Sequence, residues 1–169
     1  MDLNIRSGWT PGLIGYTAAT HARYYAREWG FGPIFEAKVA GGMADFVARY
    51  DPSRDALLWA AIEGEIAGTI TIDGSDPALP KGQAHLRWFI VSDSARGLGV
   101  GRRLFNAALS HLEEAGFSSC YLTTFAGLDP ARRLYESAGF VLREEAEGDN
   151  WGTRVTEQMF LLERSRASV

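Results

Sequence analysis

The residues with the clearest chemical meaning form a glycine-rich segment, Arg96-Gly97-Leu98-Gly99-Val100-Gly101-Arg102. Because glycine has no Cβ, alternating glycines let the backbone turn several N–H groups toward one point. The segment follows a predicted strand and opens a predicted helix, so the positive end of the helix dipole points to the same place. This arrangement predicts an anion cradle suited to a pyrophosphate, in which Arg96 and Arg102 add charge-assisted contacts.

Two other phosphate-binding motifs fit this segment poorly. A Walker loop ends in Gly-Lys-Ser/Thr, whereas this segment continues as Gly-Arg-Arg. A dinucleotide-binding fold places Gly-x-Gly-x-x-Gly after the first strand of a βαβ unit, whereas this segment reads Gly-x-Gly-x-Gly and follows a predicted meander. On the loop alone, a glycine-rich turn without a ligand stays open as the alternative.

The elements that must position this loop follow from the spacing of apolar residues. Helical spacing predicts one helix that starts at Thr10-Pro11 and stops at Gly30, and others over residues 35–50, over residues 100–115 and from Asp129. Segments rich in β-branched and aromatic residues predict strands at 57–62, 66–72, 84–91, 119–124, 140–145 and 155–162. This mixture predicts an α/β or α+β fold with a central sheet.

Composition limits the possible classes of function. The chain has 169 residues and a formal net charge of −4, which argues against nucleic-acid binding, and its length predicts a single domain over residues 1–169. The single Cys120 favours a reducing cytoplasm and is expected to be a buried structural thiol. The longest clean apolar run, residues 57–62, is far shorter than the ~20 residues of a membrane span, so we expect no membrane segment or secretion signal. No metal site is expected.

A second motif lies later in the chain, Leu134-Tyr135-Glu136-Ser137-Ala138-Gly139-Phe140. Together with Arg96, Gly99 and Gly101, and in this order, it resembles the signature of the GNAT superfamily of acyl-CoA-dependent N-acetyltransferases. The resemblance implies a mixed, mostly antiparallel sheet of six to seven strands flanked by about four helices, with acetyl-CoA as cofactor. Residues 24–30 and 35–37 also resemble the acetyltransferase half of proteins that fuse a MarR-type regulator to a GNAT domain, but we expect no DNA-binding half here.

The resemblance implies places for the cofactor and for an acid. In this superfamily the pantetheine arm lies along the fourth strand, where a bulge exposes backbone groups that correspond to Phe89, Ile90 and Val91. An N–H group there can stabilise negative charge that develops on the thioester oxygen. Tyr135 matches the tyrosine that protonates the leaving thiolate, although its spacing alone suits a core aromatic. Leu128 stands where many members carry an asparagine that contacts the pantetheine.

The identity of the general base stays open. A lysine-like amine has a pKa of about 10.4 and must lose a proton before it attacks. His85 lies about where some superfamily members carry a glutamate base, and strand alternation predicts that it shares a sheet face with Arg87 and Phe89. A histidine without a role is an equally weighted alternative, and Glu63 or Asp93 could serve instead.

Acceptors in this superfamily bind opposite the cofactor, among the first helices and the last strand pair. The resemblance therefore implies Tyr25, Glu28, Glu36 and Trp151 as candidates for substrate binding, with the carboxylates suited to a cationic amine. Glu28 and Glu36 also fit the alternative of solvated charges on a helix surface.

These inferences favour one function over two alternatives. The favoured function is direct transfer of an acetyl group from acetyl-CoA to a primary amine of a small molecule or peptide, in a ternary complex and with a homodimer possible. The first alternative is a catalytically inactive acyl-CoA-binding sensor. The second is a structural domain without a nucleotide ligand, for which the glycine loop has no binding role.

Overall fold

The computed structural model describes residues 1–164 and contains seven strands, four α-helices and one short 3-10 helix in that range. The strands are β1 (Leu3–Ser7), β2 (Ala56–Ile62), β3 (Glu65–Asp73), β4 (Gln83–Val91), β5 (Ser119–Phe125), β6 (Val141–Gly148) and β7 (Val155–Glu163). The helices are α1 (Leu13–Trp29), α2 (Pro33–Ala48), η1 (Asp93–Ala95), α3 (Val100–Glu114) and α4 (Asp129–Ser137). Among these residues, no helix combines the length and the apolar character that crossing a bilayer requires.

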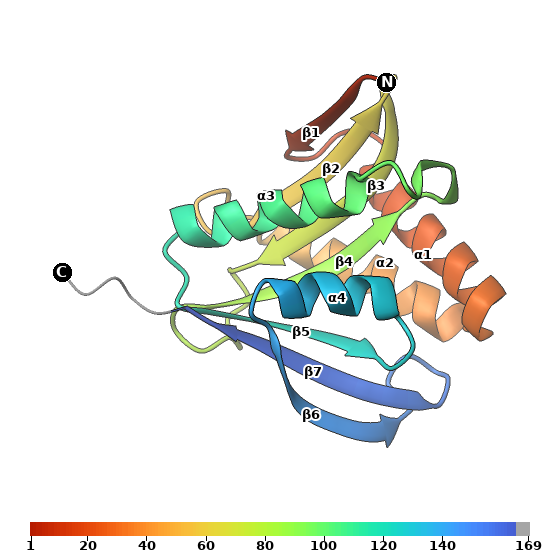
Figure 1. The fold of residues 1–169 in the computed structure, drawn as a ribbon, viewed down its shortest axis with the longest axis vertical. Helices are drawn as coiled ribbons and strands as arrows, with labels where there is room; N and C mark the ends of the chain where they lie inside the picture. The colour runs from red at the N-terminus through yellow and green to blue at the C-terminus, as the bar shows by residue number, and fades with distance from the viewer. Residues whose placement is uncertain (165–169) are drawn as a thin grey trace.

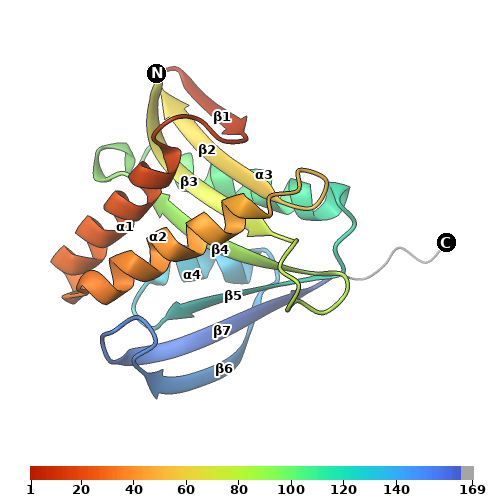
Figure 2. The same cartoon turned by 180° about the vertical axis from the view of Figure 1, so that it is seen from behind.

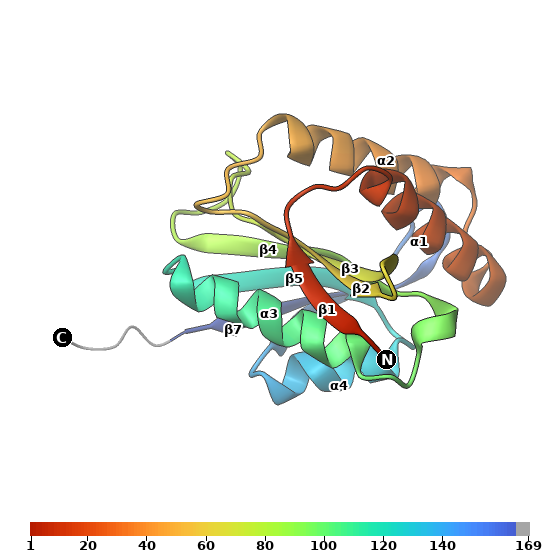
Figure 3. The same cartoon turned by 90° about the horizontal axis from the view of Figure 1, so that it is seen from above.

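The strands form one sheet that lies between two pairs of helices. Their order across the sheet is β1-β2-β3-β4-β5-β7-β6, and each neighbouring pair is antiparallel except β4 and β5. Helices α3 and α4 cover one face (Figure 1), and α1 and α2 cover the other (Figure 2). Figure 3 shows the sheet between the two helical layers. The predicted fold class is therefore confirmed.

The N-terminal segment differs from its prediction in two respects. Strand β1 lies outside the predicted elements, although Leu3 and Ile5 alternate with polar residues as an edge strand requires. Helix α1 begins at Leu13 rather than at Pro11, because Gly12 caps it in the left-handed region with φ of +87°. The carbonyl of Thr10 accepts the N–H of Leu13 at 3.1 Å, so Thr10 and Pro11 belong to a turn before the helix.

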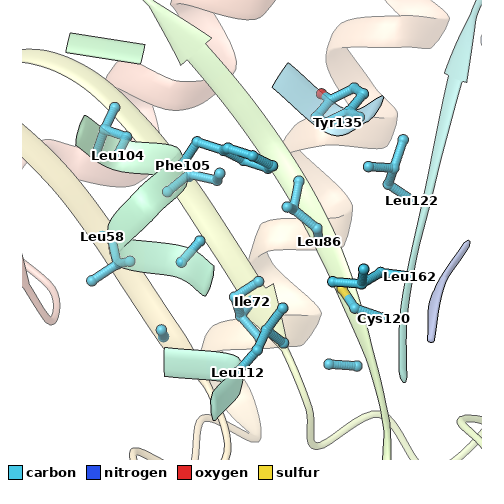
Figure 4. Close-up of a cluster of buried hydrophobic side chains, with 14 of the residues drawn as sticks. Leu58, Ile72, Leu86, Leu104, Phe105, Leu112, Cys120, Leu122, Tyr135 and Leu162 are labelled. Carbon is cyan, nitrogen blue, oxygen red and sulfur yellow. The ribbon is translucent and has the colours of Figure 1, made fainter. Parts of the chain in front are cut away.

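The core between the sheet and α3 is built from apolar side chains of both layers (Figure 4). Leu104 and Leu112 of α3 and Ile72 of β3 are fully buried members of this core. Cys120 of β5 lies in the same cluster, where burial raises the pKa of its thiol to about 12. Cys120 is thus a buried thiol of the core, as predicted.

The core on the other face explains how α2 tolerates two glycines in its middle. Helix α2 stays continuous through Gly41 and Gly42. A Cβ at Gly42 would lie 2.9 Å from Cζ2 of Trp88, which is closer than side chains normally approach. The glycine therefore lets α2 pack directly on Trp88, a residue of β4 that also lines the cleft described below.

A buried ion pair ties α2 to the sheet. The fully buried carboxylate of Asp73 accepts two hydrogen bonds from Arg49, both at 2.7 Å, and a third from Arg87 at 3.2 Å. Burial alone would raise the pKa of Asp73, but the hydrogen bonds and charges of the two guanidinium groups outweigh it and lower that pKa below its usual value.

Removing the charge of Asp73 should therefore destabilise the protein. Asp73→Asn is expected to lower the free energy of unfolding by about 3 kcal/mol at neutral pH, because two partly buried guanidinium groups lose their counter-charge. A carboxyl with a lowered pKa stabilises the fold above its unfolded pKa, and this contribution is lost as the pH falls through the folded pKa. The difference between Asp73→Asn and wild type should thus shrink in acid.

Urea unfolding at neutral and acidic pH measures this difference, with Asp45→Asn on the exposed face of α2 as the matched control. Equal unfolding midpoints for wild type and Asp73→Asn at neutral pH would contradict the expected role of the ion pair.

Candidate active site

The centre of the sheet opens where β4 and β5 separate. The two strands pair in parallel only at Gln83 with Ser119, Ala84 with Cys120, and His85 with Tyr121. Beyond His85, β4 continues to Val91 and β5 continues to Phe125 without pairing to each other. Figure 1 shows the two strands diverging from this shared start. The backbone of β4 that faces β5 is therefore open to a ligand.

A β-bulge bends β4 at the point where the strands part. Thr71 pairs with Arg87 and Thr69 pairs with Ile90, so Trp88 and Phe89 together oppose Ile70. Trp88 has φ of +51°, an uncommon conformation for a bulky residue that costs about 1–3 kcal/mol. The guanidinium of Arg87 lies 4.1 Å from the Trp88 ring centroid, which helps to hold the bulge in place.

The prediction that His85, Arg87 and Phe89 share one sheet face is wrong, because the bulge lies between Arg87 and Phe89. Trp88 packs in the core cluster of α1 and α2, whereas the next residue, Phe89, packs with the cluster of α3. His85 and Arg87 precede the bulge and lie on the α1 and α2 side, because Leu86 between them is buried on the α3 side. An extra residue in a strand inverts the alternation after it, so strict periodicity fails here.

A cleft of about 1180 Å³ passes through this opening and joins the two faces of the sheet. Its walls on the α3 and α4 side include the glycine loop, Phe89, Val91 and Tyr135. Its walls on the α1 and α2 side include Tyr25, Trp29, Phe35, Lys38 and Trp151, together with His85 and Arg87. One ligand can therefore enter from each face and meet the other at the bulge.

The glycine loop forms the rim of the cleft at the start of α3. Gly97 and Gly99 have φ of +80°, a conformation that L side chains rarely adopt. The first backbone hydrogen bond of α3 runs from the N–H of Arg103 to the carbonyl of Gly99, the N-cap residue. The N–H groups of Val100, Gly101 and Arg102 thus have no intrahelical acceptor and are available for hydrogen bonding.

Arg96 is held by protein partners at the cleft wall. Its Nε donates to Asp93 at 3.0 Å, and its guanidinium lies 4.5 Å from the ring centroid of Tyr24. Asp93 also accepts a hydrogen bond from Arg27 of α1 at 2.7 Å. This cluster fastens α1 to the glycine loop, and it makes Asp93 an ion-pair partner rather than a free base.

Tyr135 of α4 lies between the core and the cleft. Its ring packs against Phe105 and Phe140, with centroids 5.8 and 6.0 Å away, and Figure 4 shows it at the end of the core cluster. Burial raises the pKa of its phenol well above the usual value, and the charge that Tyr25 would carry if ionised raises it further. Tyr135 therefore stays protonated at physiological pH and can only donate its proton.

His85 stacks on its strand partner Tyr121, with ring centroids 4.1 Å apart and Nδ1 3.1 Å from the tyrosine oxygen. Burial and the nearby charge of Arg87 lower the pKa of His85 to about 3. The imidazole is therefore uncharged at physiological pH. It keeps an open lone pair on Nε2 only in the tautomer whose Nδ1–H donates to Tyr121.

The other predicted residues divide between the cleft and the outer surface. Tyr25, Glu28 and Trp151 line the cleft, although Glu28 also accepts a hydrogen bond from Arg27 at 2.8 Å. Glu36 is exposed on α2 and is not part of the cleft wall, because helical geometry turns Phe35 and Lys38 toward the cleft instead. Leu98 and Glu63 also lie outside the wall.

The cleft wall also contains residues that were not predicted, among them two with titratable side chains, His21 of α1 and Lys38 of α2. His21 is buried, and its Nδ1–H donates to the carbonyl of Thr17 at 2.7 Å. Burial lowers its pKa to about 4. The available signal was helical spacing, since His21 stands three residues after Ala18 and four before Tyr25 on the apolar face of the helix.

Comparison with known families and proteins gives a consistent result. The sequence profile of the acetyltransferase (GNAT) family matches residues 16–140. An uncharacterized N-acetyltransferase of Schizosaccharomyces pombe is 31% identical over 121 residues, which are 71% of this chain and 72% of that protein. The mycothiol acetyltransferase of Thermomonospora curvata is 32% identical over 95 residues, which are 56% of this chain and only 27% of that protein.

A solved structure supports the fold. A protein of Salmonella typhimurium described as an acetyltransferase, solved with its cofactor acetyl-CoA, superposes with a TM-score of 0.73. The alignment covers 99% of this chain and 96% of that chain at 17% sequence identity. At this identity the likeness concerns the arrangement of helices and strands.

Proposed function

Because this chain belongs to the acetyltransferase (GNAT) family, we propose that its cleft binds acetyl-CoA and brings the acetyl group to a primary amine of a small molecule or peptide. The observation that carries this proposal is the cleft through the split sheet, which joins an anion cradle on one face to an aromatic pocket on the other. Such a passage lets the two substrates meet in a ternary complex without a covalent enzyme intermediate.

The residues on the α3 side fit the proposed cofactor. The free N–H groups at the start of α3 suit the pyrophosphate, and Arg102 stands beside them in the cleft wall. On the side that faces β5, the backbone of β4 between Phe89 and Val91 has no strand partner and offers hydrogen bonds to an extended amide-containing arm. Leu128 at the start of α4 offers an apolar contact in place of an amide. When bound, acetyl-CoA supplies an activated acyl thioester.

Two side chains of this protein transfer protons in the proposed reaction, one as a donor and one as an acceptor. The new amide bond forms between the amine nitrogen and the acetyl carbon as the C–S bond breaks. The Tyr135 phenol gives its proton to the departing sulfur. The amine attacks in its uncharged form, and Nε2 of His85 accepts its proton as the C–N bond forms, because the nitrogen becomes acidic at that stage. A backbone N–H of the bulge stabilises the negative charge on the acetyl oxygen, an effect often worth about 3 kcal/mol.

The role of His85 predicts a pH-independent loss of rate. His85→Ala is expected to lower kcat about 100-fold, by a similar factor from about pH 5 to pH 8, because the imidazole stays uncharged over that range. Steady-state values of kcat for wild type and His85→Ala across this range measure the loss. The second buried histidine of the cleft, His21, is unchanged in both proteins. If wild type loses rate below an apparent pKa near 6.5, the ordinary value of histidine, and His85→Ala does not, the uncharged state assigned to His85 is wrong.

Amine-dependent release of CoA tests the proposed function against a sensor. An assay of free thiol with acetyl-CoA and a panel of primary amines should show rates that rise and saturate with amine concentration, with the acetylated amine found by mass spectrometry. Saturable acetyl-CoA binding without release of CoA for any amine would instead support the catalytically inactive sensor.

A further inference from the structure

The pocket on the α1 and α2 side carries two cationic side chains that the proposed reaction does not use. Arg87 and Lys38 both line the cleft, Arg87 from β4 and Lys38 from α2. A primary amine becomes cationic when it is protonated, and like charges oppose its binding. Because Arg87 and Lys38 both line this pocket, it favours an acceptor that carries a negative charge in addition to its amine.

Arg87 has hydrogen-bonding capacity that the protein leaves unfilled. A guanidinium carries five N–H donors, and among residues 1–164 the one acceptor within hydrogen-bond distance is Asp73, at 3.2 Å. Asp73 accepts its two shorter hydrogen bonds from Arg49. The Arg87 side chain is 24% exposed where it lines the cleft. Its position is fixed by stacking on Trp88 at 4.1 Å, so its donors are preorganised for an anion.

Lys38 adds a second positive charge without a counter-charge. Within the described residues, no carboxylate lies within ion-pair distance of its ammonium group. Among residues 1–164, the one carboxylate in the cleft wall is that of Glu28, which is paired with Arg27 on α1. The charge of this pocket is thus positive on the side of α2 and β4.

The rest of this pocket is apolar and aromatic. Trp29, Phe35, Trp88, Phe125 and Trp151 line it, and Phe125 packs between Trp29 and Trp151 with ring centroids 4.9 and 5.8 Å away. Such walls bind an apolar side chain and exclude water from charged groups, which strengthens the attraction between a carboxylate and the Arg87 guanidinium.

We propose that the acceptor is an amino acid with an apolar or aromatic side chain, bound with its carboxylate on Arg87 and Lys38 and its amino group directed toward the bulge. This inference rests on the proposed acetyltransferase function. The acetyl group then joins the α-amino nitrogen, whose proton leaves to His85, while Tyr135 protonates the thiolate released from the thioester.

Matched pairs of acceptors test this proposal directly. We would compare L-phenylalanine with phenethylamine, L-tryptophan with tryptamine, and L-methionine with 3-(methylthio)propylamine, following CoA release and the acetylated product. The amino acids should react with kcat/KM at least about tenfold higher than the amines that lack the carboxylate. L-Phenylalaninamide, which has no carboxylate, should also react with a lower kcat/KM than L-phenylalanine, even though its weakly basic amine is more often uncharged at neutral pH.

Variants then assign the preference to the two cations. Arg87→Met should raise the KM for L-phenylalanine at least about tenfold more than it raises the KM for phenethylamine, because any change in the bulge that Arg87 supports affects both acceptors alike. Lys38→Met, on an exposed helix surface that tolerates substitution, should show the same pattern to a smaller degree. Lys81→Met, in the loop between β3 and β4 and outside the cleft wall, is the matched control and should match wild type.

The outcomes separate this inference from the proposed function. Equal or faster reaction of the amines that lack a carboxylate, or of L-phenylalaninamide, would overturn the inference while the transferase function stands. A KM for L-phenylalanine that is unchanged in both Arg87→Met and Lys38→Met would also overturn it. Failure of every acceptor in a wider amine panel would overturn the transferase function and this inference with it.

Discussion

Tyr135→Phe is expected to lower kcat at least about 100-fold while the Kd for acetyl-CoA stays within about twofold of wild type, because the change removes only a proton donor. The ring of Tyr135 packs among Phe105, Phe140 and Phe160, and phenylalanine keeps these contacts. Burial keeps the phenol protonated, so no ionised form of Tyr135 limits the wild-type rate at neutral pH. Single-turnover rates and calorimetric titration measure the two quantities.

A matched variant outside the cleft shows whether the loss of kcat is specific to the phenol of Tyr135. Tyr50→Phe also removes a phenol, but Tyr50 packs on Phe46 outside the cleft wall and should keep the wild-type kcat. If Tyr135→Phe keeps the wild-type kcat with its preferred amine, Tyr135 is not the acid and the proton must come from another group or from water.

Gly101→Glu is expected to weaken acetyl-CoA binding about 100-fold, because a carboxylate about 5 Å from a phosphate, at an effective dielectric constant of about 20, opposes binding by about 3 kcal/mol. A Cβ at Gly101 would lie 3.6 Å from the Phe89 ring, an ordinary contact, so the substitution leaves the backbone unstrained. Titration calorimetry with acetyl-CoA measures the Kd.

Two companion variants isolate the effect of charge in the cradle. Gly101→Ala adds a methyl group alone and should bind acetyl-CoA within about threefold of wild type, since the added Cβ meets only ordinary contacts. Gly41→Glu places the same charge on the exposed face of α2, where a Cβ meets no atom within 4 Å, and should bind like wild type. Equal affinity of Gly101→Glu and wild type would show that the glycine loop is not the cofactor site.

Local signals in the sequence were sufficient for most of the fold. Gly30 ends α1 with φ of +71°, as its position after the apolar repeat predicted. The glycine loop was identified because its residue types, its spacing and its place between a strand and a helix all agreed. Strand β1 was missed because a five-residue edge strand offers only two apolar residues, Leu3 and Ile5, to establish a period.

The site depends on features that local periodicity does not contain. Nothing in the spacing of β4 reveals that Trp88 adopts a positive φ, and this single bulge decides that Arg87 and Phe89 face opposite layers. The pairing of Asp93 with Arg27, in addition to its neighbour Arg96, depends on the approach of α1 to the glycine loop. The place of Lys38 in the cleft wall likewise follows from the packing of α2 on the sheet.

Binding of acetyl-CoA to the purified protein is the most direct test of the proposed function. In a thermal-shift titration, a ligand present at about 100 times its Kd stabilises the fold by about 2.7 kcal/mol, which raises the Tm by a few degrees for a chain of this size. We expect a saturable rise for wild type and a much weaker one for Gly101→Glu. An unchanged wild-type Tm at millimolar acetyl-CoA would contradict both the transferase and the sensor.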